Sequence, residues 1–451
     1  MIWLLALQTA FAERPELPFE RTSELYPIKV HWERDGDEAK ADRILAAVEL
    51  SWAVQVVELG FRAPILPDGK DGGRHGPELD LYLIALGASQ AWAAPDNYLD
   101  NIDDGYSGTA AYMAVDWNLP DHLIDPYIAH EFNHVLQFAT DFNELTLPIW
   151  EATATCAQTW TLGEAGAWDA DVADFQSDPY LNTLGGDSYY SWKNLKVAFF
   201  YEYGAALWMM HLDQVVGDSD GLAGPAIWEA TAQEGMPNEP DVIEAFATIA
   251  GEELGGALNG LARTRFLVGD DWDDRGLVEA ADWPMKAKVP AVSLEGAELP
   301  LKHEFDPPLM PTGQGFVDID LKGFAHGLDD PWLIVDATSK VGNESAVIVL
   351  WWAKDGTVGE EQSWGDIAFV EMPIAGIERV AIAVTNLEAD VWDGDKALYR
   401  DGDQELFVDV AEGPGTHEPG SGSPGCGCAT AAGPVPVWTP LIALLVARRP
   451  R

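Results

Sequence analysis

The residues with the clearest chemical potential form one short string, since residues 130–134 read His-Glu-Phe-Asn-His. Residues four apart lie on the same face of an α-helix, so His130 and His134 can bind one metal ion. Neutral imidazole nitrogens suit zinc, and Glu131 lies where its carboxylate can take a proton from water activated by that metal. The string therefore predicts a zinc centre with a general base beside it.

A catalytic zinc centre needs a third protein ligand, and the best candidate is Glu151. Pro148 predicts the start of a second helix, with Glu151 in its first turn. The residues between the two helices predict a turn that folds the second helix back on the first. The rival ligands are Asp141 and Glu144 in that connection, and His122 upstream of the motif. In the simplest alternative, Glu151 only favours the N-terminus of its helix.

The motif must lie on a helix with one apolar face. Asp125 and Pro126 predict the start of that helix, because Asp is a good N-cap and Pro suits the first helical position. An apolar stripe then recurs at helical spacing through Ile128, Phe132, Val135 and Ala139. This places both histidines at the boundary between the core and a cleft.

Upstream of the motif, the hydrophobic pattern predicts an α+β unit. Strands are expected at 28–32, 79–84 and 110–116, and a helix at 39–59. Residues 110–116 directly precede the motif helix, and we expect them to form the sheet edge that binds an extended peptide. After Glu151 the chain is predicted to be mainly helical, with runs near 194–215, 224–234 and 240–268.

The motif and the sequence Trp-Glu-Ala-Thr-Ala at 150–154 together resemble the gluzincin class of zinc metallopeptidases. The resemblance covers roughly residues 15–270. It implies a zincin-like fold, in which a mixed sheet lies over the motif helix and a Glu of the second helix completes the metal centre. One departure is Ala152, because gluzincins commonly have Gly or an asparagine-bearing motif around the third ligand.

Gluzincins also use a downstream Tyr or His that stabilises the oxyanion of the tetrahedral intermediate. Residues 200–207 resemble the Tyr-Glu-x-Gly helix of one aminopeptidase-like branch, which implies Tyr201 as the donor. Tyr203 and His211 are alternates. The competing interpretation for each of them is packing in a helical core.

From about residue 290 the helical periodicity ends, and short β-rich runs separated by turn residues predict an antiparallel β-sandwich over 290–411. The expected runs are 316–321, 332–335, 346–351, 367–370 and 380–384. The region has no recognisable catalytic group, so we expect an accessory role. A Gly/Pro/Ser linker follows at 412–425.

Both ends of the chain indicate export. Residues 1–12 predict a signal peptide that ends in Ala-Phe-Ala, and the catalytic unit then spans 13–289. At 426–451, a Cys motif, an apolar segment and terminal arginines resemble the Myxo-CTERM sorting tail of myxobacterial surface proteins. The resemblance implies transient membrane association through the tail and a final location at the cell surface.

The chain is strongly acidic, with 26 Lys and Arg against 75 Asp and Glu and a net charge of −49. This balance excludes nucleic acid as an electrostatic partner. It indicates a solvated acidic surface, with scattered calcium sites as the rival interpretation. Cys156 is the only cysteine before the tail, and we expect it to be a small buried apolar residue.

These features predict an α+β protein: a zincin-like catalytic unit followed by a β-sandwich. The expected function is that of a secreted or surface-anchored zinc-dependent peptidase acting on a protein or peptide. One alternative is an inactive zincin scaffold used for surface adhesion, although the intact Glu131 argues against it. Another is a calcium-dependent adhesive β-protein. The oligomeric state stays open.

Overall fold

A computed structural model describes most of the chain, and the residues that it describes belong to one compact unit. The described residues are 14–67, 76–87, 89–99, 106–142, 144, 147–163, 168–184, 200–232, 241–322, 324, 328–340, 342–388 and 404–414. The predicted signal peptide, most of the predicted linker and the predicted sorting tail lie outside them.

The N-terminal part is built on a mixed sheet with the order β1-β2-β3-β5-β4. Its strands are β1 (Phe19–Thr22), β2 (Ile28–Trp32), β3 (Leu79–Ile84), β4 (Ala91–Leu99) and β5 (Thr109–Asp116). β2, β3 and β5 are parallel to one another, whereas β1 and β4 run antiparallel to their neighbours. The strands predicted at 28–32, 79–84 and 110–116 are confirmed as β2, β3 and β5.

The edge strand of this sheet differs from the one predicted from the sequence. β5 lies between β3 and β4, so the expectation that residues 110–116 form the edge was wrong. The edge strand next to β5 is β4, which hydrophobic periodicity missed because it is rich in alanine and contains Pro95. Proline has no N–H for a sheet ladder and is therefore confined to edges, bulges and strand starts.

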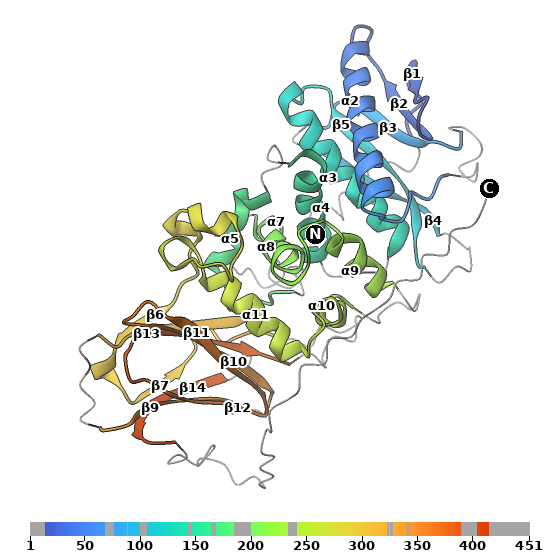
Figure 1. The fold of residues 1–451 in the computed structure, drawn as a ribbon. Helices are drawn as coiled ribbons and strands as arrows, with labels where there is room; N and C mark the ends of the chain where they lie inside the picture. Colours follow the sequence, from blue (N-terminus) through green and yellow to red (C-terminus); the bar gives the residue numbers. More distant parts are fainter. Residues whose placement is uncertain are drawn as a thin grey trace, which may run out of the picture. The chain divides into compact units, whose positions relative to one another are not determined.

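Three long helical segments surround the candidate site: the first and second pack on this sheet, and the third packs on the second (Figure 1). They are α2 (Glu38–Ser51), which continues as a π-helix over Trp52–Glu58, α3 (Asp121–Thr140) and α4 (Leu147–Leu162). α3 carries the motif and contacts β4, β5, α2 and α4. The helix predicted at 39–59 is confirmed, and so is the apolar stripe of α3, whose members are all fully buried.

The start of the motif helix differs from the prediction by one turn. α3 begins at Asp121 with Pro120 as its N-cap, so Pro126 lies inside the helix. A proline there deprives the carbonyl four residues earlier of its helical hydrogen bond. That carbonyl belongs to His122, in an exposed first turn where water can replace the lost partner.

Further helices follow the motif and α4. They are α5 (Val172–Ser177), α7 (Tyr201–Gly204), α8 (Ala206–Met210), a π-helix over His211–Val216, α9 (Ala223–Thr231), α10 (Val242–Ala250) and α11 (Leu254–Phe266). The run predicted at 240–268 is therefore two helices. Gly251 ends α10 in the left-handed conformation, with φ 68°, which glycine adopts at little cost.

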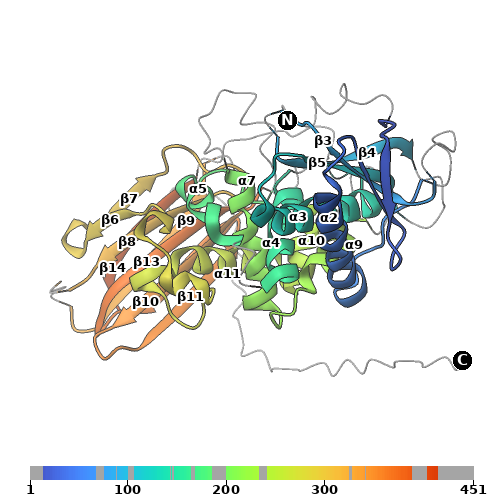
Figure 2. The same ribbon diagram turned by 90° about the horizontal axis from the view of Figure 1, so that it is seen from above.

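Two more sheets follow within the described residues, with the orders β11-β10-β13-β8-β6 and β12-β9-β14-β7. Their strands are β6 (Val292–Glu295), β7 (Leu301–Glu304), β8 (Gln314–Asp320), β9 (Pro331–Ser339), β10 (Ser345–Ala353), β11 (Val358–Gly365), β12 (Ile367–Pro373), β13 (Ile377–Asn386) and β14 (Gln404–Glu412). The sheets form two layers in Figure 1, which overlap when seen from above in Figure 2. The layers share one core, to which both contribute valines such as Val335 and Val349. Their described pairings are antiparallel except that β6 runs parallel to β8.

The five predicted runs correspond to β8, β9, β10, β12 and β13, whereas β6, β7, β11 and β14 were missed. α11 packs against β10, β11 and β13, and the ring of its Phe266 stacks on that of Phe316 in β8, with centroids 6.3 Å apart. The described chain is thus a mixed α+β structure with several β-sheets. None of its helices is long and apolar enough to cross a membrane.

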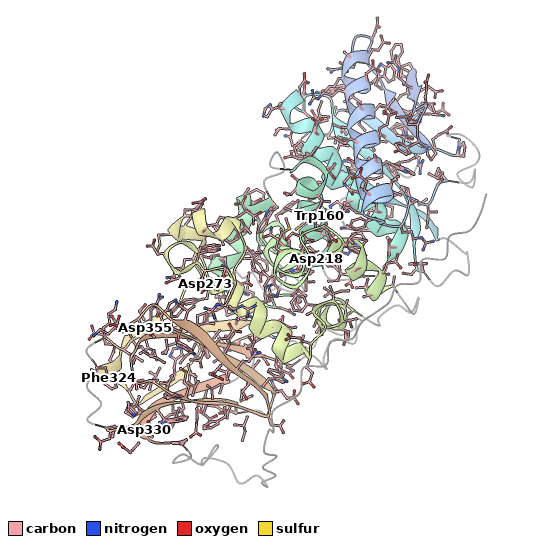
Figure 3. All side chains as sticks on the ribbon, in the orientation of Figure 1. Trp160, Asp218, Asp273, Phe324, Asp330 and Asp355 are labelled. Carbon is pink, nitrogen blue, oxygen red and sulfur yellow. The ribbon has the colours of Figure 1, made fainter. Side chains whose placement is uncertain are left out.

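The acidic side chains are spread over the surface. Asp218, Asp330 and Asp355 are all exposed and lie in different parts of the described chain (Figure 3). Within the described residues, His130, His134 and Glu151 are the only group of three or more His, Cys, Asp or Glu side chains positioned to hold one metal ion. The described part of the chain therefore offers no such carboxylate cluster for calcium. Cys156 is fully buried, as expected.

Candidate metal centre

The packing of α3 against α4 brings three potential ligand atoms together. Nε2 of His130 lies 3.1 Å from both Nε2 of His134 and Oε2 of Glu151. Nε2 of His134 lies 3.6 Å from the same oxygen of Glu151. Two donors bound at about 2.1 Å to a tetrahedral ion lie about 3.4 Å apart, so the triangle fits such an ion. A donor set of two imidazoles and one carboxylate suits several first-row metals.

The rival ligands lie elsewhere. Asp141 accepts a hydrogen bond of 2.5 Å from the hydroxyl of Ser107, which ties the end of α3 to the sheet region. His122 is exposed in the first turn of α3. The carbonyl of Glu144 accepts from the indole of Trp150 at 3.1 Å, and Glu144 is not part of the metal-binding group.

Glu151 lies one residue deeper in its helix than expected, because α4 begins at Leu147, which puts Glu151 at the start of the second turn. Ala152 next to it is fully buried in the core, whereas Glu151 keeps part of its side chain exposed. Helix packing therefore turns Glu151 toward the histidines of α3. A position in the second turn also weakens the alternative in which Glu151 serves only the helix N-terminus.

The two histidines and Glu151 shift one another's protonation. Burial would raise the pKa of Glu151, but the charge of His134 and hydrogen bonds from both histidines hold it well below its usual range. Burial would lower the pKa of His134, but Glu151 and Glu131 raise it to about 9. Without a metal ion, protonated His134 therefore pairs with the ionised carboxylate of Glu151. A metal cation would have to replace that proton.

This arrangement predicts how the stability of the chelator-treated protein depends on pH. A histidine whose pKa rises from 6.5 to about 9 on folding stabilises the folded state fully below about pH 6.5. That contribution is lost as the pH rises through about 9. We expect the melting temperature in EDTA to fall between pH 6.5 and 9, measured by calorimetry. A flat profile over that interval would contradict the pairing of His134 with Glu151.

Glu131 lies between the cluster and the edge strand. It is only 8% exposed, and burial raises its pKa above the ordinary value, with Glu151 adding to the shift. His134, His130 and the backbone N–H of Ala93 in β4 act in the opposite direction. A carboxylate with a raised pKa beside a metal centre is suited to accept and return a proton.

Of the expected oxyanion donors, the structure brings Tyr203 to the cluster and not Tyr201 or His211. The ring of Tyr203 stacks on His130 with centroids 5.7 Å apart. The charge of Glu151, followed by burial and the charge of Glu131, raises the pKa of Tyr203, so its hydroxyl stays protonated. Tyr203 therefore offers a hydrogen-bond donor beside this cluster.

Tyr201 and His211 are in the core. Tyr201 is fully buried against Phe175, and its hydroxyl donates to the carbonyl of Asn182 at 3.4 Å. His211 is also buried, its Nδ1 lies 2.9 Å from the Thr264 hydroxyl, and burial lowers its pKa to about 3. The resemblance-based choice of Tyr201 is thus not supported by its position, because its side chain faces α5.

A glycine lets α7 approach closely enough for this arrangement. A Cβ on Gly204 would lie 2.3 Å from the carbonyl oxygen of Asp171 and 2.8 Å from Cβ of Phe175. Such contacts are too short for any side chain. Gly204 therefore allows α7 to pack against α5 while Tyr203, the preceding residue, faces His130.

Several residues around the cluster were missed by the sequence analysis. The outer nitrogens of the histidines face side-chain amides: Gln137 lies 2.7 Å from Nδ1 of His134, and Gln158 lies 3.1 Å from Nδ1 of His130. Spacing offered a weak signal for Gln137, which is one turn from His134 on α3. Spacing offered none for Ala93, because strand β4 itself was not recognised.

Comparisons with known proteins leave the family undefined. No protein-family model matches the chain, and no curated protein matches it. Among solved structures, the pre-peptidase C-terminal domain of a collagenase from Bacillus anthracis is 9% identical with a TM-score of 0.17, over 27% of this chain and 95% of that one. The Yersinia pseudotuberculosis-derived mitogen is 12% identical with a TM-score of 0.17, over 26% and 92%. Both scores are too low to support an argument about function.

Proposed function

We propose that this protein is a zinc-dependent peptidase of the zincin-like, gluzincin type. The observation that carries the proposal is the convergence of His130, His134 and Glu151 on one point, with the buried carboxylate of Glu131 beside them. The mixed sheet, with the motif helix packed against its edge strand, supports the proposal, because the resemblance to gluzincins implies a sheet over the motif helix.

His130, His134 and Glu151 would hold the zinc ion. Bound there, zinc would supply a Lewis acid that polarises the scissile carbonyl and lowers the pKa of water toward 7. Glu131 would take the proton of the attacking water and deliver it to the leaving amine. Burial raises the pKa of Glu131, which makes its carboxylate a better proton acceptor between the two transfers.

Tyr203 would donate a hydrogen bond to the oxygen that becomes negatively charged during attack. A donor already directed at developing charge lowers the barrier because little reorganisation is needed. The peptide substrate would extend along β4, whose outer side has no partner strand in the described sheet. The N–H of Ala93 links this strand to Glu131 and would keep the general base next to the substrate backbone.

The direct test combines metal analysis with proteolysis of the full chain. We expect one zinc ion per chain, cleavage of casein or a broad peptide library, loss of cleavage in chelator and recovery on adding zinc. Zinc binding without any cleavage would favour the inactive surface scaffold instead. A chain that binds no zinc would overturn the proposal.

Tyr203→Phe is expected to lower kcat about 100-fold with zinc affinity unchanged, because one donor to the developing oxyanion is lost. Tyr201→Phe is the matched control on the same helix, and we expect it to keep kcat close to that of the unmodified protein. Steady-state kinetics on one peptide would check both variants. The reverse order of effects would restore Tyr201 as the donor.

Export and surface attachment belong to the same proposal, as does an accessory role for the two C-terminal sheets. Export and surface attachment rest on the predicted signal peptide at 1–12 and the predicted sorting tail at 426–451. Mass spectrometry of the mature protein would show whether both segments are removed.

A further inference from the structure

A buried chain of side-chain amides ends on one of the proposed metal ligands. Nδ1 of His134 lies 2.7 Å from Oε1 of Gln137, and Nε2 of Gln137 donates to Oδ1 of Asn133 at 2.8 Å. Nδ2 of Asn133 in turn donates to Oε1 of Gln55 at 3.1 Å. Gln55, Asn133 and Gln137 are all fully buried. We call these three residues the amide relay.

The direction of the amide relay is set by backbone carbonyls, which can only accept. Nε2 of Gln55 donates to the carbonyl of Ala129 at 2.9 Å, so Oε1 of Gln55 must face Asn133. Asn133 then presents its NH₂ group to Gln55 and its oxygen to Gln137. Nε2 of Gln137 also donates to the carbonyl of Trp150 at 3.0 Å, which fixes the same orientation independently.

This direction has a consequence for His134. Because Gln137 presents an oxygen, Nδ1 of His134 must carry the hydrogen, and Nε2 is left with the lone pair in the neutral ring. Nε2 is the atom that faces His130 and Glu151. The amide relay thus selects the tautomer that can bind a metal ion and holds the ring in that orientation.

His130 is held differently. Its Nδ1 faces the amide of the partly buried Gln158 at 3.1 Å. With its nitrogen toward the ring, the amide of Gln158 donates to Nδ1 of His130, so the hydrogen of the neutral ring lies on Nε2. The isosteric flipped amide would favour hydrogen on Nδ1 and release Nε2 for a metal ion. The tautomer of His130 can therefore change with one amide rotation, whereas that of His134 is fixed.

The far end of the amide relay lies outside the motif helix. Gln55 belongs to the π-helix Trp52–Glu58, and its Nε2 also donates to the hydroxyl of Thr161 in α4 at 3.0 Å. Gln55 therefore links the π-helix, the motif helix and the helix of Glu151. Single-turn π-helices occur frequently near functional sites, where they place a side chain that a regular α-helix would direct elsewhere.

We infer that the amide relay makes Gln55 a positioning residue for the metal centre, because it fixes the tautomer and the ring orientation of His134 through Asn133 and Gln137. This inference rests on the proposed metal centre. Gln55 does not touch the cluster itself, so its effect should appear first in metal affinity and only through that in turnover.

The test is the zinc affinity of the full-length Gln55→Met variant, measured by competition with a chromophoric chelator. Methionine keeps the length of the side chain but cannot complete the hydrogen bonds to Asn133, Ala129 and Thr161. We expect affinity to fall about tenfold, within the range found when outer partners of metal ligands are removed. Gln137 contacts His134 directly, so Gln137→Met should lower zinc affinity at least as much.

Gln176→Met is the matched control, because Gln176 is equally buried and donates to a helical carbonyl, that of Arg265. We expect it to lower the melting temperature while zinc affinity is kept. If Gln55→Met lowers the melting temperature and leaves affinity unchanged, Gln55 is only structural and the inference is wrong. If the unmodified protein binds no zinc, the proposed function fails instead.

A measurement on the unmodified protein covers the case in which neither relay variant folds. In the zinc-loaded protein, ¹⁵N-edited NMR should show the hydrogen of His134 on Nδ1, protected from exchange with water by Gln137. A hydrogen on Nε2, or a rapidly exchanging one on Nδ1, would overturn the inference without any substitution.

Discussion

Replacing Glu131 with glutamine is expected to leave zinc binding intact and to slow peptide hydrolysis about 100- to 10,000-fold. The amide has nearly the same shape as the carboxylate but cannot take a proton from water. Glu131 is nearly fully buried, and its carboxylate interacts with the N–H of Ala93 in β4, so the variant should keep the local packing. Zinc content and kcat, measured on the same preparation, check this prediction.

The matched control is Glu229→Gln. Glu229 is partly buried and accepts a hydrogen bond of 2.5 Å from the hydroxyl of Tyr106, which a glutamine oxygen can also accept. We expect this variant to keep its activity. A Glu131→Gln protein that hydrolyses peptides at the unmodified rate would exclude Glu131 as the general base.

Replacing Glu151 with glutamine is expected to lower zinc affinity by more than about 100-fold, a larger loss than that of an outer partner. The neutral amide oxygen is a weaker ligand than the carboxylate whose oxygen lies within 3.6 Å of Nε2 of both histidines. The variant also removes the charge that raises the pKa of His134, so the melting temperature in EDTA should no longer fall between pH 6.5 and 9.

Asp141→Asn is the control for Glu151, because Asp141 was the rival ligand on the sequence and its amide can still accept from Ser107. We expect this variant to keep full zinc affinity. Titration with a chromophoric chelator measures both variants. Loss of zinc binding in Asp141→Asn together with its retention in Glu151→Gln would reassign the third ligand.

The two histidines of the candidate site could be predicted from helical periodicity alone. His130 and His134 are one helical turn apart, so any helix through them places both imidazoles on one face. The apolar stripe beside them determined which face is buried, and the structure agrees at each of its positions. Glu151 could be proposed as a ligand from the sequence for a related reason. Pro148 indicates a helix start, and the short connection brings α4 back along α3.

The donor at the oxyanion could not be chosen in this way. Tyr201 and Tyr203 are two residues apart, which is about 200° around a helix, so only one of them can face the metal centre. Sequence similarity favoured Tyr201, but α5 packs on that side of α7 and buries the residue against Phe175. The side of a short helix that faces a site depends on the elements packed against the helix rather than on its own sequence.

The sequence also did not reveal the residues that support the histidines, because their contacts come from distant parts of the chain. The pattern of the helix predicted at 39–59 gave no reason to bury a glutamine, yet the structure buries Gln55 fully and leaves the neighbouring Val56 partly exposed. A buried glutamine is stable only where its amide is hydrogen-bonded, and its partners Ala129, Asn133 and Thr161 lie 74 to 106 positions further along the chain. Edge strand β4 was missed because proline and alanine weaken the strand pattern.

The sequence alone thus determined the two histidines of the candidate metal centre, the helix that carries them and the mixed α+β character of the described chain. These depend on spacing within one or two turns, where local geometry follows directly from the order of residues. Only the tertiary structure decided that Glu151 rather than Asp141 meets the histidines, that Tyr203 faces them, that β4 forms the edge and that Gln55 supports His134. Each of these depends on contacts between elements far apart in the chain, and such contacts are selected by packing and by the need to pair every buried polar group.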